Sequence, residues 1–268
     1  MAWDLQGKTI LITGATDGIG RQAALDLADL GARMIVHGRE PARLGALLDA
    51  LAGPHEAVAA DFASLHAVRG MAAEVLAKHA RLDVLIHNAG TYEPAFRLTK
   101  DGLERTLAVN HVAPFLLTHL LLEHLIASAP ARILVVASIA HLRARPGLGP
   151  APDQDYSAYG EYARSKLANL WFTLALARRL EGTGVTVNAL HPGVIGTKLL
   201  RAAFGTQGAP VEDGALRIVH LAASPDLAEM NGAYFVDDRP TIPSPAAADP
   251  SLQEQWWTLS QRWAGLRT

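Results

Sequence analysis

The sequence predicts an α/β fold in which one doubly wound parallel sheet is covered by helices on both faces. Short runs of β-branched or aliphatic residues alternate with longer amphipathic segments along the chain. The strand runs are almost continuously apolar, as expected for strands that are buried on both faces. Because crossovers between parallel strands are right-handed, doubly wound topologies are the main candidates. No linker-like composition divides the chain, so we expect a single domain.

Each expected strand is a short run rich in aliphatic residues. From the N-terminus these runs are KTILIT (8–13), RMIVHG (33–38), EAVAAD (56–61), LDVLIH (82–87), RILVVAS (132–138), VTVNALH (185–191) and GAYFV (232–236). The segments between them have the apolar spacing of helices. Helices are expected at 18–31, 41–52, 64–79, 101–127, 157–181 and 211–223, and Gly31 closes the first of them.

The composition predicts a soluble protein with a large core. A chain of 268 residues, half of them hydrophobic, suffices for one large α/β domain. We expect residues 1–240 to form this domain and residues 241–268 to be an extension packed on it, where QWWTLSQRWAGL contributes three tryptophans. The most apolar segment, 112–127, is interrupted by two histidines and a glutamate. It falls short of the roughly 20 apolar residues of a membrane span. The first residues lack the features of a signal peptide.

Charge and cysteine content exclude several classes of function. The chain has 24 basic and 26 acidic residues, so no nucleic-acid or anionic-membrane partner is expected. It has no cysteines, which excludes disulfides and thiolate zinc sites and is typical of a reducing cytoplasm, the expected location. The histidines show no metal-ligand spacing with acidic residues, so no metal site is expected. We interpret them as packing or surface residues and expect His141 to lie near the substrate.

A glycine-rich turn, TGATDGIG (13–20), follows the first strand and opens the first helix. Backbone N–H groups and the helix dipole at this position favour a bound phosphate. Gly14 permits the turn, Gly18 a close approach to a pyrophosphate, and Gly20 close packing of the helix on the strand. The alternative is a plain turn, and Asp17 places an unfavourable negative charge near the phosphates. The strand–turn–helix context favours a dinucleotide cradle.

The end of the second strand, VHGRE (36–40), bears on the choice of cofactor. An acidic side chain there holds a free ribose 2′-hydroxyl, whereas a 2′-phosphate requires a cation. Arg39 occupies this position, with the first carboxylate only at Glu40. Arg21 adds charge nearby or, equally, is a solvated helix residue. We therefore predict NADP(H) as the preferred cofactor and NAD(H) as the alternative.

Three tyrosines lie close together in DYSAYGEYARSK (155–166), and spacing distinguishes them. On a helix, residues four apart share a face. Tyr162 and Lys166 are four apart, whereas Tyr159 has Ala163 at that spacing and Tyr156 lies at or before the helix start. A nearby cation lowers the tyrosine pKa from about 10 by favouring the phenolate. Tyr162 is therefore the candidate proton donor, and Tyr159 is expected to be a packing or substrate-side neighbour.

Other motifs occur in the order in which one family places them. HNAG (87–90) ends the fourth strand, Asn110 lies in LAVNHVAPF, Ser138 ends the fifth strand, and HPGVIGT (191–197) follows the sixth. Together with the glycine turn and the Tyr–Lys pair, they make residues 5–240 resemble the short-chain dehydrogenase/reductase family, which has a Rossmann-type fold. The tail from residue 243 resembles retinol-dehydrogenase-like members. His87 departs from the asparagine that is usual in the family.

The resemblance implies hydride transfer between a nicotinamide and a carbonyl or alcohol carbon. It makes Tyr162 the general acid in reduction and the general base in oxidation. It also implies that Lys166 lowers the tyrosine pKa and bonds the nicotinamide ribose. Ser138 would bond the substrate oxygen, and Asn110 would anchor a water that relays protons, or simply bond backbone.

The same resemblance implies the cofactor contacts and the partners. The expected cofactor-binding residues are Gly14, Thr16, Asp17, Gly18, Ile19, Gly20, Arg39, Asp61, Phe62, Asn88, Ala89, Gly90, Tyr162, Lys166, Pro192, Gly193, Val194 and Thr197. Asp61 would contact adenine or, alternatively, cap the next helix. The expected partner is a small carbonyl or alcohol substrate, and two or four copies of the chain would associate through the 101–127 and 157–181 helices.

Substrate contacts are expected from residues 139–156 and 194–210. The second segment contains three glycines and several apolar residues, which is typical of a mobile lid over a hydrophobic substrate. The alternative is an amphipathic helix that buries those residues in the core. Two other functions on this scaffold are an epimerase or dehydratase and a nucleotide-sensing binding protein. Ser138, Tyr162 and Lys166 together favour the oxidoreductase over both.

Overall fold

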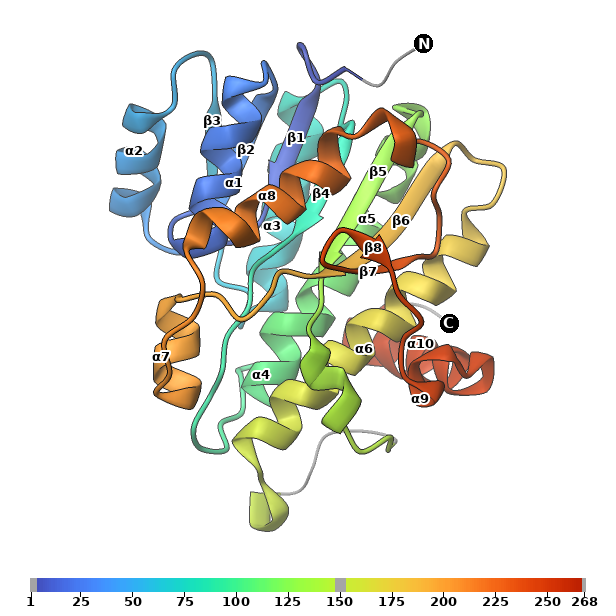
Figure 1. Ribbon diagram of the computed structural model, residues 1–268. Coiled ribbons are helices and arrows are strands. Elements are labelled where there is room, and N and C mark those ends of the chain that lie inside the picture. The colour runs from blue at the N-terminus through green and yellow to red at the C-terminus, as the bar shows by residue number, and fades with distance from the viewer. Residues whose placement is uncertain (1–3, 148–152, 267–268) are drawn as a thin grey trace.

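In the computed structural model, which describes residues 4–147 and 153–266, the strands form one sheet (Figure 1). Its order is β3-β2-β1-β4-β5-β6-β7-β8, and all neighbours pair in parallel except β7 and β8. The strands are β1 (Thr9–Ile12), β2 (Arg33–Gly38), β3 (Glu56–Ala59), β4 (Val84–His87), β5 (Ala131–Val136), β6 (Val185–His191), β7 (Tyr234–Val236) and β8 (Arg239–Pro240). From β1 the chain adds β2 and β3 on one side, and it then returns to add β4, β5 and β6 on the other side. The boundary between β1 and β4 is the switch point of a doubly wound fold. The predicted fold class is confirmed.

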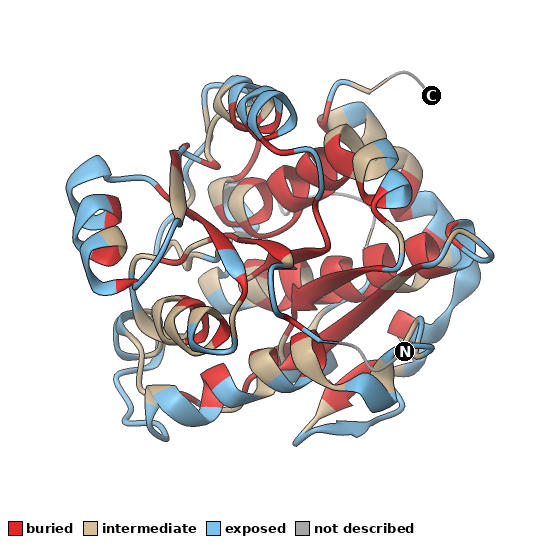
Figure 2. Cartoon of the chain, turned by 90° about the horizontal axis from the view of Figure 1, so that it is seen from above, coloured by how far each residue is buried: buried red, intermediate tan, exposed pale blue. Residues whose placement is uncertain are grey.

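Helices cover both faces of this sheet. They are α1 (Gly18–Asp29), α2 (Pro41–Ala50), α3 (Leu65–Lys78), α4 (Arg105–Leu107), α5 (Ala113–Ala127), α6 (Ala158–Arg179), α7 (Lys198–Phe204), α8 (Val211–Ala223), α9 (Pro245–Ala248) and α10 (Pro250–Trp263). Side chains of β1 alternate between two cores, because successive strand residues point to opposite faces. Ile10 and Ile12 pack with α1, α2 and α8, whereas Leu11 packs with α3, α5, α6 and α10. The central strands β1, β4, β5 and β6 and the helix faces that meet them are largely buried (Figure 2), whereas the edge strand β8 is exposed.

The long helix expected at 101–127 begins later and is interrupted. Gly102 adopts a φ of +75°, which is outside the range of a right-handed helix, so the helix cannot begin at residue 101. Glu104 then caps α4 by accepting hydrogen bonds from the backbone N–H groups of Thr106 and Leu107. A π-helical turn over Ala108–Val112 joins α4 to α5 and carries Asn110. Such single turns add a residue inside a helix and are frequent at functional sites.

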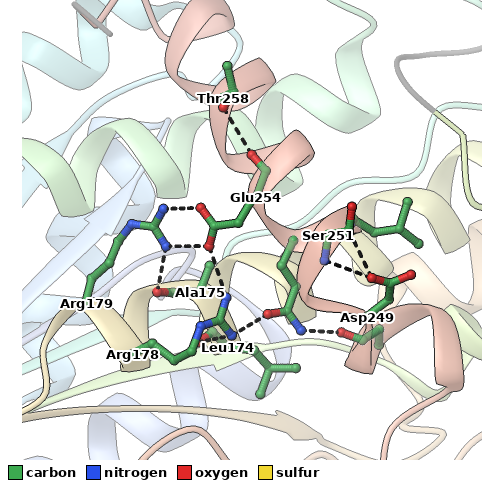
Figure 3. A network of polar contacts seen from close by, with 11 residues as sticks. Leu174, Ala175, Arg178, Arg179, Asp249, Ser251, Glu254 and Thr258 are labelled. Carbon is green, nitrogen blue, oxygen red and sulfur yellow. Dashed lines mark hydrogen bonds and ion pairs between the residues drawn. The ribbon is translucent and has the colours of Figure 1, made fainter.

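The C-terminal residues fold back onto α5 and α6. The Trp256 ring lies 4.9 Å from that of Trp171 in α6, and Arg179 lies over the Trp257 ring at 4.0 Å. Figure 3 shows the polar contacts of this interface, in which Arg178 and Arg179 of α6 bind Glu254 of α10. Aromatic burial therefore holds α10, and ion pairs border it. Across the described ranges, no helix is long and apolar enough to cross a bilayer.

Candidate active site

A cavity of about 1010 Å³ opens at the carboxyl ends of the parallel strands, on both sides of the switch point. All of the expected cofactor-binding residues line it, and so does Ser138. The volume is that of a site for a large ligand. The fold therefore brings together side chains that the sequence distributes over residues 14–197. Residues 148–152 of the expected substrate segment lie outside the described residues.

The glycine turn is shaped so that backbone approaches backbone. Gly14 has a φ of +67°, and a Cβ atom there would lie 2.7 Å from Cα of Ala89. A Cβ on Gly20 would lie 2.2 Å from Nδ2 of Asn88. Side chains are thus excluded from the turn, which presents its N–H groups at the start of α1. These residues fit the pyrophosphate of a dinucleotide.

Thr13 and Asn88 fasten this turn to the end of β4. The Thr13 hydroxyl donates to the Ile86 carbonyl and accepts from the N–H groups of Asn88 and Ala89. The Asn88 amide donates to the carbonyl oxygens of Thr13 and Gly14. Buried polar groups are thereby satisfied within the turn, which fixes its position relative to the sheet.

The negative charge of Asp17 is less unfavourable for a bound phosphate than the sequence suggested, because cations lie next to it. Its carboxylate accepts a hydrogen bond from Gly18 N and pairs with Lys198 of α7, while Arg43 lies 3.8 Å away. The hydrogen bond from Lys198 is the main cause that lowers the pKa of Asp17 below its usual value. The negative charge near the phosphate region is therefore compensated by two cations.

Two arginines line the cavity near the end of β2. One is Arg39, which is exposed, and its predicted contact with the cofactor stays a prediction. Arg43, one turn into α2, lines it as well and pairs with Glu40 at 3.0 Å. Arg43 was not predicted from the sequence, although it follows Arg39 by four residues at the start of the next helix, a spacing that could have indicated a second cation at this position. Asp61 accepts a hydrogen bond from Ala63 N, while Ser64, not Asp61, caps α3.

Tyr162, Lys166 and Ser138 meet at the opposite end of the cavity. Ser138 and Tyr162 share a hydrogen bond between their side chains, and Ser138 Oγ also accepts from Ala140 N. Lys166 Nζ lies 5.6 Å from the centre of the Tyr162 ring and donates to the Val136 carbonyl at 2.8 Å. The helical spacing thus places the Lys166 ammonium near the Tyr162 ring. The ammonium donates its hydrogen bond to the backbone of β5, not to the tyrosine hydroxyl.

The pKa of Tyr162 shifts in the direction opposite to the one expected. Burial raises it to about 12, and the hydrogen bond with Ser138 offsets only part of that rise. Burial also lowers the pKa of Lys166 to about 8. The expectation that Lys166 lowers the tyrosine pKa is corrected here, because desolvation dominates over the distant cation. Tyr162 therefore carries its proton at neutral pH.

Asn110 lies behind the cavity wall. Its side-chain oxygen accepts from Thr91 N at 2.7 Å, and its amide nitrogen donates to the Thr91 carbonyl and to Ser165 Oγ. The side chain thus fixes the loop after β4 against α6, in agreement with the backbone-bonding alternative. His141 likewise bonds backbone, since its ring contacts Ser138 O and Ser244 N.

An aromatic wall, defined as Tyr92, Tyr159 and Phe204, surrounds the Tyr162 ring. Phe204 lies 5.7 Å from Tyr92, 5.8 Å from Tyr159 and 6.3 Å from Tyr162, measured between ring centres. Phe204 ends α7, whose seven residues are all at least partly exposed. The alternative of a helix buried in the core is therefore wrong. Apolar side chains also form the rim, with Ile139, Leu142 and Val194 exposed there.

Taken together, the fold and the site define a class of protein, the dinucleotide-dependent oxidoreductases. Residues 8–208 match the family model described as short chain dehydrogenase, and the chain belongs to that family. No cluster of three metal-ligating side chains occurs within 4–147 or 153–266.

Relatives with known names refine this assignment. The chain is 41% identical to human retinol dehydrogenase 14 over an alignment of 298 positions, which covers 98% of this chain and 88% of that protein. It is 37% identical to human retinol dehydrogenase 12, with the same coverage of 98% and 88%. The expected likeness to retinol-dehydrogenase-like members is confirmed.

Solved structures agree with the fold and with the cofactor class. An uncharacterized protein from Mycobacterium paratuberculosis superposes with a TM-score of 0.81 at 31% identity, covering 99% of this chain and 96% of that one. The Pseudomonas aeruginosa RhlG/NADP active-site complex has a TM-score of 0.72 at 27% identity and covers 88% of this chain and 97% of that one. The family uses NAD(P)(H) as its cofactor.

Proposed function

We propose that the protein is an NADP(H)-dependent oxidoreductase that interconverts a carbonyl and an alcohol group on a hydrophobic small molecule. The observation that carries this proposal is the arrangement of the cavity. A protonated phenol, Tyr162, lies at its apolar end, and two arginines lie at its adenosine end. The first supports the reaction, and the second supports the choice of cofactor.

Tyr162 donates the proton when the carbonyl is reduced to the alcohol. The hydroxyl that shares a hydrogen bond with Ser138 delivers its proton to the substrate oxygen, as a positioned general acid. Ser138 bonds the same oxygen while negative charge develops on it, until the proton is transferred. Gly14, Gly18 and Gly20 would hold the dinucleotide, with Lys166 near its ribose. When bound, the cofactor supplies or accepts the hydride.

The aromatic wall and the apolar rim support a hydrophobic substrate. Phe204 and Tyr159 are 41% and 38% exposed and lie 5.8 Å apart, and grouped exposed apolar side chains mark ligand-binding grooves. The named relatives are retinol dehydrogenases, and retinol is itself a hydrophobic alcohol. The segment around α7, which carries Phe204, is proposed to close over such a substrate as a lid.

A panel of hydrophobic and polar aldehydes, ketones and secondary alcohols, read by NADPH absorbance, tests this function. We expect hydrophobic carbonyls to be reduced with NADPH. Tyr162→Phe should lower kcat by about 10²-fold or more while NADPH still binds, because the general acid alone is lost. Unchanged turnover in this variant would refute the assignment. NADPH binding without turnover in the wild type would favour the sensing protein.

The association of copies through the 101–127 and 157–181 helices stays a prediction. Sedimentation of the purified chain measures it directly. Because α10 packs on the face of α6 that carries Trp171, that face is covered within the same chain. We therefore expect any association of copies to use other faces of α6.

A further inference from the structure

His37, the residue before Gly38 in β2, contacts the glycine turn that borders the cavity. It lines the cavity and is only 2% exposed. Its Nδ1 atom accepts a hydrogen bond from Gly14 N at 3.2 Å, and its backbone carbonyl accepts from Ala15 N at 2.8 Å. One residue therefore holds two successive amides of the glycine turn.

The other ring nitrogen of His37 reaches the third strand. Nε2 lies 3.0 Å from the Ala60 carbonyl, which can only accept a hydrogen bond. The proton must therefore be on Nε2, which leaves Nδ1 as the acceptor for Gly14 N. This tautomer is neutral, and burial lowers the pKa of His37 to about 4. The hydrogen bonds and the burial thus require the same protonation state.

The ring also supports one wall of the cleft. His37 stacks on Phe62 with ring centres 4.3 Å apart and planes inclined by 19°. Phe62 follows Asp61 at the end of β3 and lines the cavity. The imidazole therefore sets the distance between the glycine turn, which fits the pyrophosphate, and Phe62 on the adenosine side.

We propose that neutral His37 is a positioning residue for the nicotinamide dinucleotide, which holds the glycine turn and the adenosine wall at the spacing that the cofactor requires. This inference rests on the proposed function, since it assumes a dinucleotide in this cleft. Without the ring, Gly14 N would be a buried donor lacking its partner, and the turn would relax to satisfy it. Cofactor affinity would then fall, while the distant substrate end would be unchanged.

His55 provides a matched control. Its Nδ1 accepts from Met34 N at 3.1 Å and its Nε2 contacts the Ala52 carbonyl at 3.0 Å, so it has the same bonding pattern. Met34 lies near the opposite end of β2, away from the cavity. Replacing His55 removes hydrogen bonds to the same two kinds of backbone group, in a more exposed setting and outside the residues that line the cavity.

The test compares NADPH affinity, by calorimetric titration, in His37→Phe, His55→Phe and the wild type. We expect His37→Phe to raise the Kd for NADPH by about tenfold or more, the effect of a lost buried hydrogen bond. His55→Phe should lower the thermal midpoint but leave that Kd unchanged. The KM for the carbonyl substrate should stay constant in both. A His37→Phe protein that binds NADPH as the wild type does would overturn the inference.

Two further variants apply if His37→Phe does not fold. Asn places an oxygen where Nδ1 was and can still accept from Gly14 N, whereas Gln places an N–H where Nε2 was and serves only Ala60. We expect His37→Asn to bind NADPH more tightly than His37→Gln, and the reverse order would contradict the proposal. A wild-type protein that binds neither NADPH nor NADH would overturn the proposed function and this inference together.

Discussion

Asp17 in the glycine turn and Lys198 in the first turn of α7 form an ion pair, although 181 positions separate them in the chain. The pair connects the phosphate end of the cavity to the segment that carries Phe204. Both side chains are exposed, 45% and 69% respectively, so water screens their attraction. Its main effect is therefore expected on ligand binding, with little on stability.

Replacing Lys198 by Ala tests this expectation. The free energy of unfolding should change by less than about 1 kcal/mol, as for other exposed pairs. The Kd for NADPH should rise, because Asp17 would then face the phosphates with Arg43, 3.8 Å away, as the cation that still offsets its charge. Adding Asp17→Asn to the Lys198→Ala protein should restore affinity. Titration at low and high salt measures both effects, and an unchanged Kd at low salt would contradict the prediction.

Arg43 should contribute to the choice between NADPH and NADH. Arg43→Ser should weaken NADPH binding by about tenfold or more and leave NADH binding nearly constant, since only the 2′-phosphate distinguishes the two. Arg39→Ser should act in the same direction. Arg33→Ser, which removes an exposed arginine paired with Glu56 at the other end of β2, is the control. Equal effects on both dinucleotides would exclude a phosphate contact.

Buried histidines should make the fold sensitive to acid. Burial lowers the pKa of His37, His111 and His191 to about 4 and that of His87 to about 3. The unfolded chain binds these protons near pH 6.5 and the folded chain does not, so stability is complete above pH 6.5 and is lost as the pH falls toward 4. Each histidine contributes about 1.4 kcal/mol per pH unit in this window.

Urea unfolding at pH 7 and pH 5.5 checks this dependence. His111→Gln removes one titrating group that does not line the cavity, since the His111 ring bonds Ser260 and Asn169. The variant should be less stable at pH 7 but should lose less stability on acidification than the wild type. Identical pH dependences would show that folding does not lower the pKa of His111.

Trp256 should anchor the C-terminal helix. It is 1% exposed, and its indole nitrogen donates to the Gly147 carbonyl at 3.1 Å. Trp256→Ala should lower the free energy of unfolding by about 3–5 kcal/mol, the usual range for a buried tryptophan. Gln255→Ala on the exposed side of α10 is the control and should have little effect. Chemical denaturation of both variants measures the difference.

Local patterns were sufficient for most of the fold, because buried parallel strands are aliphatic whatever surrounds them. The strands β2 and β6 have the predicted limits, and α1 begins at Gly18 as expected. The interruption before α5 was not predictable in this way. It depends on the φ of Gly102 and on the cap at Glu104, which a periodic apolar pattern does not record.

The site shows the same division between local and distant determinants. Helical spacing identified the Tyr162–Lys166 pair, but not the hydrogen bond of Lys166 to Val136, 30 residues earlier. The burial that sets both pKa values is likewise a property of the folded molecule. The role of His37 requires Gly14 and Ala60, each 23 residues away on another strand end. Such contacts become visible only when the sheet order is known.

The two-residue strand β8 has a consequence for how the molecule behaves in crowded solution. It is the antiparallel edge of the sheet, where Pro240 pairs with Phe235 of β7. Proline has no backbone N–H to offer, and two residues are too few to template a further strand. The β7 side of the sheet is thus closed to strand addition from a neighbouring molecule, which protects the folded chain against edge-to-edge aggregation.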